Sequence, residues 1–186
     1  KNKLILKTGF NHRFHPAIMK AESIVDSGQI GEIINIRCRY GHGGRPGMEN
    51  EWRCSKDLCG GGELLDQGVH LIDLTRWFLN GKIKEVFGQV FTSFWGIEVE
   101  DNAFFTLKSD NNIYVQCHAS WTNWKNIFSY EIFGKKGYVL INGLGGSYGM
   151  ESLEMGIRQP LGGVPKIEKY EFPDIDKSWA MEWIDF

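Results

Sequence analysis

Several features that would place a protein in a class at once are missing from this chain of 186 residues. No apolar run approaches the roughly 20 residues that cross a bilayer, and there is no internal repeat or low-complexity segment. The formal net charge is only −2, so neither sign dominates. These absences give no basis for a transmembrane protein, or for electrostatic binding to nucleic acid or an anionic membrane. The length fits one domain, or slightly more, with a substantial core.

Cysteine is scarce as well, with residues only at Cys38, Cys54, Cys59 and Cys117. The nearest pair, Cys54 and Cys59, has no matching second pair, so a zinc site that also uses His42 has little support. We therefore predict no metal site, free thiols and a cytoplasmic location.

Apolar side chains at helical spacing predict two helices. The first begins near Pro16, which suits a first helical turn, and ends at Ser27-Gly28. Its apolar stripe is Phe14, Ala17, Ile18, Ala21, Ile24 and Val25. The second spans residues 63–79 and is stopped by Asn80-Gly81. We also predict short strands over 4–10 and 33–40, and a long loop over 41–59.

After residue 82 the apolar side chains alternate, which predicts strands. The runs are 83–95, 102–108, 112–121, 127–133, 137–142, 148–155 and 166–172. The short links at 109–111 and 134–137 predict antiparallel hairpins. Two helices followed by a run of strands predict an α+β domain, with a predominantly antiparallel open-faced sheet and the helices packed on one face.

One predicted strand is apolar on both sides, which helices on a single face cannot cover. In the run 83–95, Val86, Val90 and Phe94 alternate with Phe87, Phe91 and Trp95. An uncovered apolar face of several hundred Å2 is unusual on a monomer and marks an interface. We therefore predict a homo-oligomer formed through the sheet face, either a dimer or a tetramer built from dimers.

The predicted helix over 63–79 carries the candidate chemistry. Its core-facing stripe is Leu64, Gly68, Leu71, Ile72, Thr75, Phe78 and Leu79. Asp66, His70 and Asp73 lie on the opposite face, which puts a carboxylate and an imidazole one turn apart. Such a pair suits proton exchange with a hydroxyl near neutral pH, whereas an ordinary solvated face is the simpler interpretation of this stripe alone. The three glycines at 60–62 indicate an unusual turn or a close approach of the backbone to another segment.

Three stretches of the chain resemble a known family. The run Gly60-Gly61-Gly62-x-Leu64-x-Asp66-x-Gly68-x-His70-x-x-Asp73 is similar to the signature of the glucose–fructose oxidoreductase and inositol dehydrogenase family, which comprises NAD(P)-dependent sugar and polyol dehydrogenases. The stretch Gly9-Phe10-Asn11-His12-Arg13-Phe14-His15-Pro16 resembles the junction between that family's two domains, and Trp52-Arg53 also fits. The resemblance covers nearly all of the chain.

Two parts of the family's pattern are absent. No Gly-x-Gly-x-x-Gly follows a strand and opens a helix, since the glycines at 143–146 lie between strand-like runs and indicate a turn. The family's Glu-Lys-Pro motif is missing too. The resemblance therefore implies an excised C-terminal domain without the Rossmann domain. Residues 1–10 would be the remnant of the inter-domain strand and junction. Residues 11–186 would be a substrate-binding and dimerisation domain, truncated at its last helix.

The resemblance also implies roles for particular residues. His70 would exchange a proton with the substrate hydroxyl, and Asp66 would orient the substrate or the imidazole. The family's catalytic lysine would come from the absent half. The full-length protein would use NAD or NADP, whereas this fragment would hold no cofactor-binding residues and would be inactive.

Four further residues are candidates for binding substrate. Arg13 and Asn11 precede a helix N-terminus, where they could hold a polar group of the substrate, and ordinary helix capping is the alternative. Trp52 and Arg53 could line a sugar pocket, and anchoring of their loop is the alternative. The expected partner is a sugar, a sugar derivative or a cyclic polyol. The competing hypothesis is a non-catalytic carbohydrate-binding or dimerisation module with the same fold.

Overall fold

Eight strands form one open sheet in the computed structural model, which describes residues 4–186. The strands are β1 (Ile33–Gly41), β2 (Ile83–Phe91), β3 (Asn102–Ser109), β4 (Tyr114–Ser120), β5 (Ile127–Gly134), β6 (Gly137–Asn142), β7 (Glu151–Ile157) and β8 (Lys166–Phe172). Their order in the sheet is β2-β3-β4-β1-β5-β6-β7-β8, and within the described residues every neighbouring pair is antiparallel except β1 with β4. The predicted hairpins β3–β4 and β5–β6 are both present.

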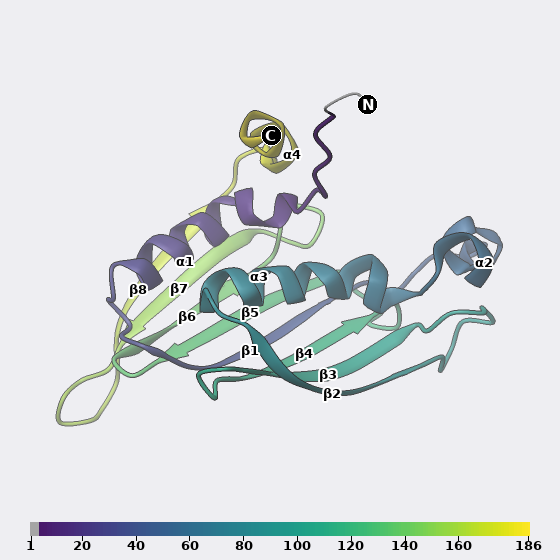
Figure 1. Cartoon of the computed structure of the whole chain (residues 1–186). Helices are drawn as coiled ribbons and strands as arrows, with labels where there is room; N and C mark the ends of the chain where they lie inside the picture. The colour runs from purple at the N-terminus through teal and green to yellow at the C-terminus, as the bar shows by residue number, and fades with distance from the viewer. Residues whose placement is uncertain (1–3) are drawn as a thin grey trace.

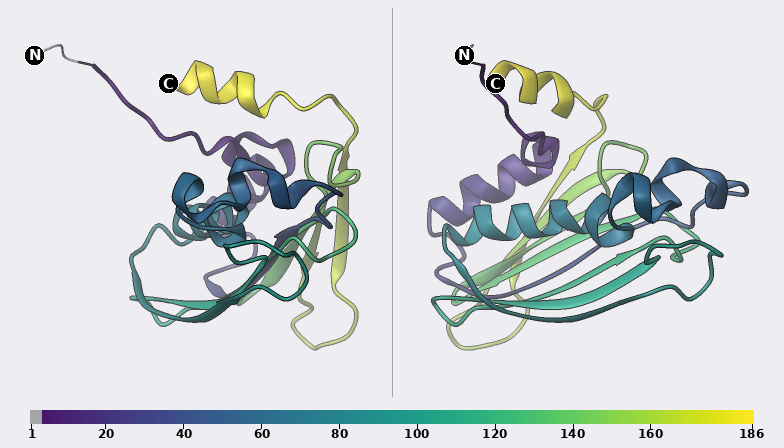
Figure 2. Two further views of the ribbon diagram at one scale, coloured as in Figure 1. Left: turned by 90° about the vertical axis from the view of Figure 1, so that its right-hand side faces the viewer. Right: turned by 45° about the vertical axis from the view of Figure 1, so that its right-hand side comes forward.

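The helices lie on one face of this sheet (Figures 1 and 2). Helix α1 (Pro16–Asp26) packs on β6, β7 and β8, and α3 (Val69–Leu79) packs on β1. Pro16 occupies the first turn of α1 as predicted, because its missing N–H costs nothing there. Apolar residues of both helices interdigitate with the sheet residues that point toward them, for example Ile18, Leu71 and Cys117. The predicted α+β fold is confirmed.

Exposed phenylalanine side chains gather on the uncovered face of the sheet at one edge. Phe87, Phe91 and Phe104 of β2 and β3 are 56%, 41% and 49% exposed, and the Phe104 ring stacks on His118 of β4 at 3.9 Å. Farther across the same face the side chains are charged, as in the Arg37–Glu131 ion pair. The exposed phenylalanines of β2 and β3 thus form an aromatic patch over β2, β3 and β4, which includes the outward side of the strand predicted to be apolar on both sides.

Strand β2 ends at Phe91, earlier than the run 83–95 predicts. The buried carboxylate of Asp101 accepts hydrogen bonds from the backbone N–H groups of Ser93, Phe94 and Trp95 at 2.9, 2.9 and 3.0 Å. These groups are consequently drawn into a loop instead of a strand ladder. The alternation of apolar residues does not reveal a side-chain cap of this kind, so the pattern predicts a strand that is too long.

The predicted loop over 41–59 contains short helical turns. They are η2 (Met48–Asn50), η3 (Trp52–Cys54) and the four-residue α2 (Lys56–Cys59). Buried residues from these turns, from the segment after β2 and from the end of β4 form a second small core, which comprises Met48, Cys54, Val99 and Trp121. This core closes the end of the sheet that lies next to the triple glycine.

The predicted strand over 4–10 is not formed, and the first three residues of the predicted 1–10 junction lie outside the described part of the chain. Residues 4–10 have no neighbouring strand to pair with, so their side chains and backbone stay largely exposed. The segment instead meets α4 (Ser178–Asp185), where the Glu182 carboxylate accepts a hydrogen bond from the Phe10 N–H and Lys7 pairs with Asp185. Figure 1 shows α4 beside this segment and away from the sheet.

The triple glycine is explained by both of the causes that the sequence suggested. Gly60 has a φ of 77° and terminates α2 in the left-handed region, where glycine is favoured. Gly62 passes so close to another segment that a Cβ built on it would lie 2.0 Å from the Glu100 carbonyl oxygen. That approach is fixed by a hydrogen bond from the Glu63 N–H to the same oxygen at 3.0 Å. Among residues 4–186, no helix has the length and apolar character needed to cross a bilayer.

Candidate functional site

A cavity of about 270 Å3 lies above the sheet at the N-terminal ends of α1 and α3. Its lining comes from segments far apart in the sequence: Asn11, His12, His15, Tyr40, Asp66, Gln67, His70, Leu144, Ser147, Tyr148, Asp176 and Trp179. Larger hollows of about 1010 and 840 Å3 lie elsewhere on the molecule, but neither is lined by a histidine. The small cavity is therefore the candidate site, since it alone of the three brings imidazoles and carboxylates together.

Asp66 and His70 are both in this cavity, as the sequence pattern predicts. Asp66 lies in a π-helical turn, η4 (Leu64–Gly68), and His70 follows in the first turn of α3. Gly68 faces Ala119 of β4, and a Cβ built on Gly68 would lie at an ordinary contact distance of 3.5 Å from that side chain. The Asp66 side chain stays 39% exposed, whereas the His70 ring is partly buried.

The His70 imidazole is held between aromatic rings. It stacks on His12 with a centroid distance of 3.9 Å and an interplanar angle of 21°, and Phe10 meets it edge-on at 5.8 Å. Its Nδ1 is buried without a hydrogen-bond partner among the described residues. Burial lowers the pKa of His70 below the ordinary value of 6.5, and the carboxylates of Asp73 and Asp66 oppose that shift only in part. His70 is consequently a neutral imidazole at pH 7.

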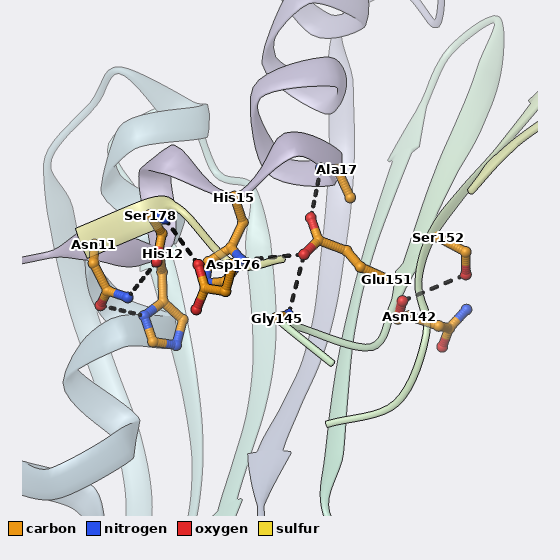
Figure 3. Close-up of polar contacts among 10 residues, drawn as sticks. All are labelled: Asn11, His12, His15, Ala17, Asn142, Gly145, Glu151, Ser152, Asp176 and Ser178. Atoms are coloured by element: carbon orange, nitrogen blue, oxygen red, sulfur yellow. Dashed lines mark hydrogen bonds and ion pairs between the residues drawn. The ribbon is translucent and has the colours of Figure 1, made fainter. Parts of the chain in front are cut away.

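His12 is itself fixed by a short chain of hydrogen bonds (Figure 3). Asn11 Nδ2 donates to Ser178 Oγ at 2.9 Å, and Asn11 Oδ1 lies 3.2 Å from His12 Nδ1. The sequence placed Asn11 and His12 before a helix but gave no sign that the His12 ring would cover His70. Asn11 lines the cavity, as expected of a substrate-binding candidate, although both ends of its amide already have protein partners.

A second buried network supports the cavity from the side of β7. The Glu151 carboxylate accepts hydrogen bonds from the Ala17 N–H at 2.7 Å and the Gly145 N–H at 3.1 Å, and it lies 3.1 Å from His15 Nδ1 (Figure 3). It thereby caps the start of α1 and holds the 144–148 loop against it. Nothing in the sequence marks Glu151, because His15 and Ala17 are more than a hundred residues away from it.

Glu63 is a buried acid next to the site, and the sequence pattern does not single it out. Burial first, and then the charge of Asp66, raise the pKa of Glu63 to about 10. Within residues 4–186 neither carboxyl oxygen makes a hydrogen bond of good geometry, and the Ser120 backbone and the Trp121 side chain oppose the rise in pKa only in part. Glu63 is therefore protonated at neutral pH and leaves Asp66 as the charged carboxylate beside His70. The one signal available in the sequence is its place immediately after three glycines.

Asp73 does not lie on a solvated face, contrary to the helical-wheel prediction. It is only 9% exposed and forms a two-pronged ion pair with Arg13, in which Arg13 Nε donates to Asp73 Oδ2 at 2.8 Å. The side chain of Trp77 packs beside that guanidinium. The N-terminal segment runs along this side of α3, so the helix is covered on two sides. More of its surface is therefore buried than its apolar residues alone indicate.

Arg13, Trp52 and Arg53 do not line the cavity. Arg13 is held by Asp73, and Trp52 is 56% exposed with the Arg53 guanidinium 4.8 Å from its ring centroid. Arg53 is closer to the cavity residues than Trp52 is, because its Nε lies 3.8 Å from Asp66 Oδ1. Their proposed contacts with a substrate stay predictions.

No cluster of three or more histidine, cysteine or acidic side chains in the described chain is arranged to hold a metal ion. All four cysteines are free thiols, as predicted. What the cavity offers is proton chemistry: a neutral imidazole, a charged carboxylate and several groups that can hydrogen-bond to hydroxyls.

Comparisons with known proteins agree on one family. A family model described as "GFO/IDH/MocA C-terminal domain" matches residues 18–140. Levoglucosan dehydrogenase of Pseudarthrobacter phenanthrenivorans is 31% identical over 78 residues, which cover 41% of this chain and 20% of that protein. D-xylose 1-dehydrogenase (NADP+) of Haloarcula marismortui is 29% identical over 119 residues, which cover 59% of this chain and 32% of that protein.

The same fold is present in a solved structure, that of an aldose-aldose oxidoreductase from Caulobacter crescentus complexed with glycerol. It matches with a TM-score of 0.74 and 23% identity, over 94% of this chain and 50% of that chain. This chain thus spans half or less of the length of each of these proteins.

Proposed function

Since this chain belongs to the GFO/IDH/MocA family through its C-terminal domain, we propose that it is the substrate-binding and catalytic-residue domain of an NAD(P)-dependent oxidoreductase. The substrate would be a sugar, a sugar derivative or a cyclic polyol, with one of its hydroxyl groups interconverted with a carbonyl. The names of the relatives support this class, because levoglucosan and D-xylose are both sugars or sugar derivatives.

The observation that carries the proposal is the neutral His70 beside the charged Asp66 in one cavity. In the oxidation direction, His70 takes the proton of the substrate hydroxyl as the C–O bond becomes a carbonyl. Because Nδ1 is buried, Nε2 is the nitrogen that accepts this proton. Asp66 stabilises the imidazolium that results and orients the hydroxyl. In the reduction direction the imidazolium returns the proton to the alkoxide.

A bound nicotinamide would supply the partner chemistry, which is transfer of the hydride from the same carbon. Among the described residues no glycine-rich turn connects a strand to a helix N-terminus that could hold a pyrophosphate, so these residues do not fit the cofactor by themselves. Residues 11–186 would therefore act together with another part of the full-length protein. Four unpaired cysteines fit a cytoplasmic location for it.

Substrate oxidation by the full-length protein tests this function. Aldoses, anhydrosugars and cyclic polyols would each be offered with NAD+ and with NADP+, and formation of the reduced cofactor would be followed by absorbance. We expect turnover with at least one member of these classes. Binding of a sugar measured by calorimetry, with no cofactor reduction for any substrate, would favour the non-catalytic carbohydrate-binding module instead.

The chain by itself is expected to bind no nicotinamide cofactor with useful affinity, because it lacks the phosphate-binding turn. Purified residues 1–186 would be titrated with NADH and with NADPH, and cofactor fluorescence would report binding. A Kd in the micromolar range for either cofactor would contradict this prediction. The full-length protein under the same conditions is the positive control.

The chain is also expected to self-associate through the aromatic patch over β2, β3 and β4. Phe104→Glu should weaken this association, because it puts a charge among rings that would be buried in the interface. Sedimentation velocity on both proteins would measure the shift. Leu161→Glu is the matched control, since Leu161 is a fully exposed residue on a distant loop. A monomeric parent chain at tens of micromolar (roughly the range where an obligate interface persists) would show that this patch is not the interface.

A further inference from the structure

We propose that His12 is a positioning residue for proton exchange at His70: its neutral imidazole fixes the His70 ring and shields one face of that ring from water. This inference rests on the proposed role of His70. It assigns a function to a buried histidine that does not itself exchange a proton with the substrate.

The geometry of the two rings is that of a fixed stack. Their centroids are 3.9 Å apart and their planes are inclined by 21°, so one face of the His70 ring is covered by His12. The covering ring is braced on its own side by Tyr40, which meets it at 5.1 Å in an edge-on contact. His12 is only 4% exposed. Water is therefore excluded from the face of His70 that His12 covers.

The hydrogen bonds of His12 determine its tautomer. Asn11 Nδ2 donates to Ser178 Oγ at 2.9 Å, which turns Asn11 Oδ1 toward His12. Oδ1 accepts and cannot donate, so His12 Nδ1 carries the hydrogen and Nε2 keeps its lone pair. Nε2 is buried with no partner among the described residues. A second proton on this ring would be a buried charge without a counterion.

His12 consequently stays neutral over the physiological pH range. Burial lowers its pKa well below 6.5, and repulsion from His70 and His15 adds to the effect. A lysine or arginine at this position would place a fixed positive charge against His70. The His12 imidazole covers the His70 ring without adding a charge. Because His12 is anchored through Asn11 to Ser178 of α4, the orientation of His70 depends on the position of that helix.

Other groups face His70 and act on its charge in opposite directions. The carboxylates of Asp66 and Asp73 favour the imidazolium, whereas His15 disfavours it. Tyr40 is edge-on to the ring at 6.3 Å, and Tyr148 and Asp176 complete the cavity wall. Because two carboxylates pull the pKa of His70 upward, burial is what keeps this imidazole unprotonated, and the stacked His12 ring provides one full face of that burial.

The test compares His12→Ala with His12→Phe in the full-length protein. Alanine removes the stack, so the pKa of His70 should rise to the ordinary value of 6.5 or above it. Phenylalanine keeps an aromatic ring over His70 but loses the hydrogen bond to Asn11. It should preserve the low pKa of His70, although it lowers stability because the Asn11 amide oxygen is left unpaired. Ring proton shifts of 13C-labelled histidine, followed against pH, report the pKa of His70 without any need for turnover.

Activity gives the second measurement. In the oxidation direction, His12→Ala should lower turnover about 4-fold or more near pH 6 and much less near pH 8, because the extra protonation of His70 is relieved at higher pH. His12→Phe should follow the parent profile. The proposal is overturned if the His70 titration does not move in His12→Ala, or if His12→Phe behaves like alanine. Failure of the proposed function is distinguishable, because it would leave the nuclear magnetic resonance shift in place while neither variant changed the pH profile.

Discussion

Replacing His70 with alanine is expected to lower the turnover of the full-length protein by roughly 100-fold or more, the usual scale for loss of a general acid–base. Without the imidazole, the reaction loses the base that lies one helical turn from Asp66, and a carboxylate is a weaker base than an imidazole. Folding should change little, by about 1 kcal/mol, because the lost ring is partly exposed and makes one stack. Steady-state rates and thermal melts measure the two effects separately.

A matched control exists in the same chain. His118 also stacks on an aromatic ring, that of Phe104 at 3.9 Å, but it lies on the opposite face of the sheet. His118→Ala should therefore leave turnover near the parent value while causing a similar small loss of stability. Asp66→Asn should slow the reaction by disturbing orientation. If His70→Ala kept full activity, the helix would be an ordinary polar surface and the catalytic assignment would be wrong.

Gly62→Ala is expected to destabilise the protein by about 3–5 kcal/mol, at the extreme of what single substitutions do. The new Cβ would lie 2.0 Å from the Glu100 carbonyl oxygen, 2.8 Å from its nitrogen and 2.9 Å from its carbonyl carbon. These are backbone atoms, so no side-chain rotation can relieve the clash. The segment that begins η4 would have to move, and Asp66 would move with it. Chemical denaturation measures the loss, and turnover of the fraction that stays folded should fall as well.

Gly96→Ala is the control for this substitution. Gly96 lies in the loop after β2, and nothing lies within 4 Å of a Cβ built there. Its φ is not in the left-handed region, so alanine should be neutral at this position. Equal unfolding free energies for Gly62→Ala and Gly96→Ala would show that the close approach to Glu100 does not constrain the fold.

Much of this fold follows from local pattern. The stripe from Ala17 to Ile24 fixes α1, and alternation fixes most of the strands, because burial on one face imposes a period on whatever element lies there. The two hairpins follow from their short polar links. The proximity of Asp66 and His70 in the candidate site could also be predicted, since the two residues are close in sequence and share a helix face.

Contacts between segments that are distant in the sequence could not be predicted from local pattern. Asp73 has the spacing of a surface residue, yet its partner Arg13 is 60 positions away and covers it. The stack of His12 on His70 depends on how the N-terminal segment crosses α3. The role of Glu151 could not be predicted for the same reason: a single acid in a strand-like run does not reveal that it caps a helix 134 positions earlier. Each of these contacts is decided by tertiary packing rather than by the residue's neighbours in sequence.

The pH dependence of substrate oxidation tests the role of His70 most directly. The account predicts that turnover by the full-length protein rises with pH through a midpoint below 6.5, because burial holds the pKa of His70 below that value, and then stays level. His70→Gln, assayed at higher enzyme concentration, should lose this acidic limb. The same limb with the same midpoint in His70→Gln would mean that another group accepts the proton, and would contradict the account.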